Sequence, residues 1–218
     1  MKNLINNIKI GFNIFFEALS KISTWKLLAE FDIKAKYSRT YLGPLWNTLS
    51  LGVFILILTL VWSKVLNQGV DDYALYFSIS YVFWVWISNH LNESGTCLVN
   101  QSHTIKQVKL PIFVYILRMF FKNILILFHN FLIIIIVFLI SKNEITVTSL
   151  MFFPGFILVL INLFFLGSII SIISIRYHDF TQFISLCTQV MRITSFPFFL
   201  QCFYFLYLFI YMVDIVKE

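Results

Sequence analysis

Charged residues are scarce in this sequence. Only 12% of its 218 residues are Asp, Glu, Lys or Arg, whereas 60% are apolar and 19% are aromatic. A soluble globular domain has roughly 25% charged residues, because polar side chains must cover the part of its surface that faces water. The composition therefore argues against a water-soluble enzyme and predicts a protein that is surrounded by lipid.

Glycine and cysteine are also scarce, with seven and three residues. None of the glycines lies in a G-x-x-x-x-G-K-[ST] or G-x-G-x-x-G pattern, so no nucleotide site is predicted. Cys97, Cys187 and Cys202 lack the C-x-x-C spacing, and packing roles are expected for them. The four histidines fall on different segments without an H-E-x-x-H pair. We therefore predict no catalytic residue, no metal site and no cofactor.

Long runs without charge, by contrast, are abundant. One bilayer crossing takes about 20 apolar residues, and the longest run is interrupted only by Arg192. Within the runs, apolar and polar residues do not alternate as they do in a membrane barrel. We therefore predict an all-α, polytopic membrane protein. Its five expected transmembrane helices lie at about residues 43–63, 73–93, 119–140, 150–175 and 181–213.

Lys and Arg are distributed unevenly between the two sides of this topology. Most of them lie in residues 1–39 and in the loop between the second and third predicted spans. Because basic loops favour the cytoplasm, the N-terminus is expected inside the cell. The net charge of +6 is then explained by membrane topology, without nucleic acid as a partner. The chain is therefore expected to be a multi-pass protein of a membrane that borders the cytoplasm.

Residues 1–39 are predicted to lie along the cytoplasmic face of the membrane. Apolar residues recur at helical spacing from Leu4 to Ile22, with lysines between them. This pattern is typical of an amphipathic helix in the headgroup plane. A bend is expected where this segment meets the first span, because Gly43 permits unusual backbone angles and Pro44 suits the first turn of a helix.

Polar residues inside the predicted spans have two interpretations. Ser168, Ser171 and Ser174 recur at every third position. Such small residues let helices approach closely, and this interpretation is favoured over a polar path through the membrane. Glu93, near the inner end of a span, either forms an ion pair near the surface or takes part in coupling to a cytoplasmic partner.

Several motifs resemble the membrane subunit of ABC-2-type exporters of bacterial polysaccharide, especially O-antigen exporters. They occur in the family's order over roughly residues 25–190. The motifs are Phe31-Asp32-Ile33-Lys34-Ala35-Lys36-Tyr37, Leu42-Gly43-Pro44-Leu45-Trp46, Leu91-Asn92-Glu93, Ile105-Lys106-Gln107-Val108-Lys109-Leu110-Pro111, Leu117-Arg118, Lys122-Asn123, His129-Asn130 and Arg176-Tyr177-His178-Asp179-Phe180.

The resemblance implies one ABC-2-type transmembrane domain over residues 1–218. Such a chain is the permease subunit of an ATP-driven exporter that moves lipid-linked polysaccharide across the inner membrane. A second copy of the chain completes the pore, and two copies of a separate ABC ATPase dock on the cytoplasmic side. The chain itself is then no enzyme, since ATP hydrolysis is expected on the partner chain.

The resemblance also assigns candidate roles to individual residues. Six are candidates for coupling to the ATPase: His103, Lys106, Gln107, Lys109, Arg176 and Asp179. Six more are candidates for the pore entry: Lys34, Lys36, Arg39, Gly43, Pro44 and Trp46. Tyr81, Trp84 and Trp86 are candidates for an aromatic pore wall that contacts sugar rings. The alternative is anchoring at the membrane, by basic residues on the inner side and by aromatic residues at its interfaces.

Three features depart from the family pattern. His178 stands where the family usually has a second Arg, and Arg192 places a charge inside the fifth predicted span. The family's sixth helix is expected to be missing. Two alternatives therefore stay open, namely a permease for a small lipophilic compound and a truncated, non-conducting membrane fragment.

Overall fold

The computed structural model describes all residues except 1, 39, 44, 66–69, 142–151 and 192–218. The described part is helical and contains no strand. Its helices are α1 (Lys2–Ser20), α2 (Ile22–Tyr37), α3 (Leu45–Val65), α4 (Val70–Asn100), α5 (Ser102–Gln107), α6 (Ile112–Ser141) and α7 (Phe152–Arg176). A further helical stretch covers residues 179–191. The all-α prediction is thus confirmed for this part of the chain.

Three described helices are long and apolar enough to cross a membrane. They are α3 over Leu45–Lys64, α6 over Ile112–Ser141 and α7 over Phe152–Arg176. They coincide with the first, third and fourth predicted spans. The second predicted span lies within α4, which is not among the three, and the fifth reaches beyond the described residues. The count of five therefore stays a prediction.

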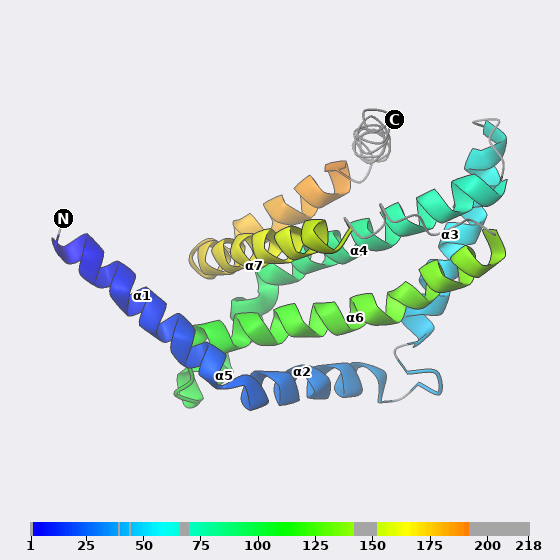
Figure 1. Cartoon of the computed structure of the whole chain (residues 1–218). Helices are drawn as coiled ribbons and strands as arrows, with labels where there is room; N and C mark the ends of the chain where they lie inside the picture. Colours follow the sequence, from blue (N-terminus) through cyan, green and yellow to red (C-terminus); the bar gives the residue numbers. More distant parts are fainter. Residues whose placement is uncertain (1, 39, 44, 66–69, 142–151, 192–218) are drawn as a thin grey trace.

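Helices α4 and α6 form the centre of the molecule. They run side by side over most of their length, and α4 also packs extensively against α7 (Figure 1). Both extend beyond the spans predicted from charge spacing, which ended at residue 93 in α4 and began at residue 119 in α6. A helix does not have to end at a charged residue, and here Glu93 of α4 pairs with Lys122 of α6.

The main apolar core lies between α3, α4, α6 and α7. Phe83 of α4 is at its centre and makes edge-to-face ring contacts with Trp86, Phe131 and Phe156. The other buried residues of this core are Leu51, Ile55, Phe77, Val82, Leu127, Ile133 and Leu163. Much of the outward side of α3 and α7 is also apolar and is exposed, as expected of helices that face lipid.

Helices α1 and α2 lie outside this bundle, with α2 alongside the first half of α6 (Figure 1). Phe15 of α1 contacts the rings of Phe113 and Phe164, while Phe12 and Phe16 are exposed. The headgroup position of this segment stays a prediction. The expected bend before the first span is confirmed, because Gly43 has a φ of 55° and α3 begins at Leu45.

Candidate functional site

One face of the last three turns of α4 is polar. Asn89, Asn92, Glu93, Thr96 and Asn100 follow one another at intervals of three, one, three and four residues. Residues at such intervals lie on one side of an α-helix. This side faces the first part of α6 and the second half of α2, where further polar residues occur. Three helices that are far apart in sequence thus bring polar side chains together.

Two ion pairs connect these helices. Arg118 of α6 binds both carboxylate oxygens of Asp32 on α2. Its Nε donates to Oδ2 over 2.6 Å, and its Nη2 donates to Oδ1. Lys122, one turn further along α6, binds the carboxylate of Glu93 on α4. The four side chains are between 16% and 31% exposed. Partly buried pairs of this kind are screened less by salt than surface pairs.

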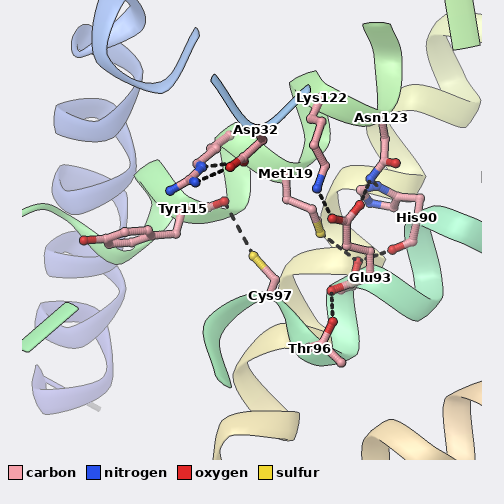
Figure 2. A network of polar contacts seen from close by, with 11 residues as sticks. Asp32, His90, Glu93, Thr96, Cys97, Tyr115, Met119, Lys122 and Asn123 are labelled. Carbon is pink, nitrogen blue, oxygen red and sulfur yellow. Dashed lines mark hydrogen bonds and ion pairs between the residues drawn. The ribbon is translucent and has the colours of Figure 1, made fainter. Parts of the chain in front are cut away.

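Glu93 is the centre of a larger network, and Figure 2 shows Lys122 and Asn123 directed toward it from the neighbouring helix. The amide of Asn123 donates to Glu93 Oε2 over 2.8 Å and lies 3.4 Å from Nδ1 of His90. Glu93 therefore has both carboxylate oxygens bound. His90 is 1% exposed, and its Nε2 has no hydrogen-bond partner among the described residues.

The opposite side of α4 is in close contact with α7 and with residues 179–191. A Cβ atom on Gly167 would lie 2.6 Å from His90 Nε2 and 2.8 Å from Ser94 Oγ, so only glycine fits there. The hydroxyl of Ser171 donates to the backbone oxygen of Ser94 over 2.8 Å. Together with the burial of Ser168 and Ser174, this favours the helix-packing interpretation of the serine repeat.

A cavity of about 720 Å³ lies next to the two ion pairs. This volume falls within the range of about 300–1,000 Å³ that is typical of small-molecule sites. The four paired residues Asp32, Arg118, Glu93 and Lys122 lie in its wall together with Lys36. Six carboxamide side chains complete much of the lining: Asn47, Asn89, Asn92, Asn100, Gln101 and Asn123.

Cys97 also lines this cavity, and its side chain is buried. Its Sγ lies 3.6 Å from the backbone oxygen of Tyr115, and burial raises the pKa of the thiol to about 12. Only the thiolate is a good nucleophile or metal ligand. The expected packing role of Cys97 therefore agrees with its surroundings. Cys187 is half-buried, and Cys202 lies outside the described residues.

The six coupling candidates lie at one end of α4. His103, Lys106 and Gln107 are exposed on the short helix α5, and Lys109 is exposed just after it. Arg176 and Asp179 flank the turn between α7 and residues 179–191. That turn is near the same end, because the hydroxyl of Thr181 donates to the backbone oxygen of Gly95 over 3.0 Å.

The pore-entry candidates lie on both sides of the bend before α3. Lys34 and Lys36 are exposed on α2, and Nζ of Lys36 lies 5.5 Å from the ring centre of Tyr37. Gly43 forms the bend, and Trp46 is exposed in the first turn of α3. Arg39 and Pro44 lie outside the described residues. Of this set, Lys36 reaches the cavity.

The aromatic candidates lie away from the cavity. Tyr81 stacks between Phe54 and Phe77, and Trp84 is half-buried. Trp86 is 2% exposed and belongs to the main apolar core. Within one chain, Trp86 therefore acts as a packing residue, and the role of the three as a pore wall stays a prediction.

The sequence did not single out the cavity itself. Asp32, Arg118, Lys122 and Asn123 occur in family-like motifs, and Arg118 and Lys122 also contribute to the basic inner loop. The polar residues of α4 have the spacing of one helix face, and Arg118 and Lys122 of α6 repeat it. The helical periodicity of these polar residues is the sequence signal that indicates a polar face on α4 and another on α6. Their partner α2 is apparent only from the tertiary structure.

Comparison with known proteins gives a partial similarity. The chain is 21% identical over 84 residues to the O-antigen export system permease protein RfbA of Myxococcus xanthus. The match covers 38% of this chain and 32% of that protein. No protein-family model matches the chain. The three helices able to cross a membrane indicate a membrane protein, and the similarity covers about a third of the length of the curated relative.

Proposed function

We propose that this chain is the permease subunit of an ATP-driven exporter that moves lipid-linked polysaccharide of the O-antigen type across the inner membrane. The observation that carries the proposal is the 84-residue similarity to an O-antigen export permease. The apolar helices α3, α6 and α7 agree with a membrane subunit. The chain itself hydrolyses no ATP in this proposal, and a separate ABC ATPase supplies the energy.

The proposed topology has five crossings in one ABC-2-type domain over residues 1–218. Helix α4 provides the second crossing, since its 31 residues span roughly 46 Å at 1.5 Å per residue. Residues 181–213 provide the fifth crossing. Residues 1–39 lie on the cytoplasmic face, where their lysines agree with the positive-inside rule. The ends of α4 and α7 that carry the coupling candidates then face the cytoplasm.

Coupling to the ATPase is proposed at α5 and at the turn after α7. His103, Lys106, Gln107 and Lys109 are exposed, so a partner can contact them without any rearrangement of the chain. Arg176 and Asp179 extend the same surface. Two copies of the ATPase bind two copies of the chain, whose pore is entered near Lys34, Lys36, Arg39, Gly43, Pro44 and Trp46. Tyr81 and Trp84 line it deeper in the membrane, where the buried Trp86 supports the pore wall from behind.

The decisive experiment measures surface polysaccharide in a strain that lacks its own permease and retains the ATPase. The strain receives either this chain or an empty vector, and membrane insertion is checked by fractionation. Restored polymer is the expected result. A chain that inserts without restoring polymer contradicts the proposal. Restored resistance to a lipophilic drug without polymer points instead to a small-molecule permease.

The coupling surface is tested by co-purification with the ATPase. Replacing Lys106 and Lys109 with Glu reverses two exposed charges and is expected to abolish co-purification. The matched control is Lys64→Glu, which reverses an exposed lysine in the last turn of α3. Retention of the ATPase by the double variant contradicts the assignment of this surface.

A further inference from the structure

The carboxamides of the cavity wall have unused hydrogen-bonding capacity. The side chains of Asn89, Asn100 and Gln101 make no hydrogen bond within the described part of the chain. Asn92 is different, because it donates to the backbone oxygen of Ser88 and accepts from Thr188. A free carboxamide offers two donated hydrogens and one accepting oxygen. A hydroxyl group also donates and accepts, so a row of free amides suits a ligand with several hydroxyls.

The charges of the wall favour a neutral ligand. Asp32 is paired with Arg118, and Glu93 is paired with Lys122. Of the Asp, Glu, Lys and Arg residues that line the cavity, Lys36 alone lacks an ion pair within the described chain, and it lies at the exposed edge. A site for phosphate or another strong anion commonly presents converging cations that are free to bind. Here the two inner cations already bind carboxylates.

The topology proposed above puts the cavity at the level of lipid headgroups. Its wall is formed by the polar end of α4 and the first turns of α6, while the apolar parts of both helices continue beyond it. Polar side chains at the end of an apolar helix lie close to the membrane surface. A headgroup attached to a membrane lipid can therefore reach the cavity, as can a soluble molecule.

We propose that this cavity binds a neutral, hydroxyl-rich group, namely a short chain of sugar units, through the carboxamides of Asn89, Asn100 and Gln101. The two ion pairs in its wall hold α2, α4 and α6 in position and contribute no net charge to the site. The proposal rests on the proposed function only in expecting the sugar to belong to an exported molecule. Binding itself requires neither the ATPase nor transport.

The test uses the full chain in phosphatidylcholine nanodiscs, without detergents that carry sugar headgroups. Triglucosyl diacylglycerol is titrated into the nanodiscs, because Asn89 and Asn100 lie roughly 16 Å apart along α4 at 1.5 Å per residue. Its binding is measured by native mass spectrometry. Asn89→Ala and Asn100→Ala are each expected to weaken binding about five-fold, the effect of one hydrogen bond. The double variant is expected to lose about 25-fold. Both residues are exposed and lack internal partners, so the variants should remain folded.

Controls separate the possible ligands. Asn162→Ala removes an exposed carboxamide of α7, which bonds only to its own helix, and should leave binding unchanged. Free maltotriose tests whether the cavity binds a soluble sugar. If its binding depends on Asn89 and Asn100, the proposal is supported and the ligand does not need a lipid anchor. Binding of phosphatidylglycerol but not of the glucosyl lipid overturns it, as does glucosyl-lipid binding that the double variant leaves unchanged. Neither result depends on export, so the proposed function is judged separately.

Discussion

The two halves of the contact between α4 and α6 differ in kind. In one half, Phe83 and Trp86 pack against Phe131, Leu127 and other apolar residues of the main core. In the other half, Glu93 binds Lys122 and Asn123, and Arg118 binds Asp32 of α2. The same pair of helices thus changes from apolar packing to a polar network within a few turns.

The difference matters because of the solvent. Lipid tails are as apolar as leucine, so burial of apolar residues between helices gains little beyond van der Waals packing. The outward side of α3 has nearly the same composition as the core, with Leu56, Ile57 and Val61 exposed. Polar contacts and close glycine packing therefore decide which helix faces lie together. We expect the largest mutational effects in the polar half.

The largest effect is expected from Glu93→Leu. It leaves Lys122 without its partner in a site where both side chains are less than a third exposed. Breaking a buried pair costs about 3–5 kcal/mol, and partial exposure reduces this to about 2–3 kcal/mol. Reversible unfolding in mixed micelles measures it. Glu17→Leu breaks the exposed pair with Lys21 and should cost less than about 0.5 kcal/mol. Equal losses of stability for Glu93→Leu and Glu17→Leu contradict the larger role given to the polar half of the α4–α6 contact.

The next effect is expected from Gly167→Ala. The added methyl group overlaps His90 and Ser94, and such overpacking costs about 1–3 kcal/mol. Gly155→Ala is the control in the same helix, because nothing lies within 4 Å of a Cβ there, and it should be neutral or stabilising. Unfolding curves of the two variants measure the difference. An equally stable Gly167→Ala variant shows that α4 and α7 can separate without cost.

A smaller effect is expected at the buried contact between α3 and α6. The hydroxyl of Thr48 donates to Oδ1 of Asn130 over 3.2 Å. Hydrogen bonds between membrane helices contribute about 0.6 kcal/mol on average, so Thr48→Val should destabilise by about that amount. The exposed Ser50, which bonds only to its own helix, provides the control as Ser50→Ala. A loss above about 2 kcal/mol for Thr48→Val contradicts the expectation that the polar half of the α4–α6 contact carries the larger effects.

The last effect concerns pH and vanishes at neutral pH, where the Cys97 thiol is protonated in both the folded and the unfolded state. Burial raises the pKa of the Cys97 thiol from an ordinary value of 9.0 to about 12. Because the unfolded thiol ionises first, the contribution of Cys97 to stability is complete below pH 9 and is lost between pH 9 and about 12. Cys97→Ala should therefore flatten the alkaline decline of stability. In the native protein, Cys97 should resist alkylation at pH 8, and rapid labelling there contradicts its burial.

The sequence predicts the helical class well and the ends of the helices less well. Spacing between charges located α3, α6 and α7, because apolar residues in lipid leave the backbone no alternative to internal hydrogen bonds. The spans that it predicts end at residue 93 and begin at residue 119, whereas helix α4 continues to Asn100 and helix α6 begins at Ile112. Glu93, Arg118 and Lys122 lie near these limits, and each is paired within a continuous helix.

By itself, the sequence determined that this is a helical membrane protein with a backbone bend at Gly43, since composition and local geometry suffice for both. Only the tertiary structure decided which polar residues meet. Asp32 and Arg118 are 86 positions apart, and no local rule relates α2 to α6. The cavity and its carboxamides exist because the packing of α2, α4 and α6 turns three separate polar helix faces toward one space.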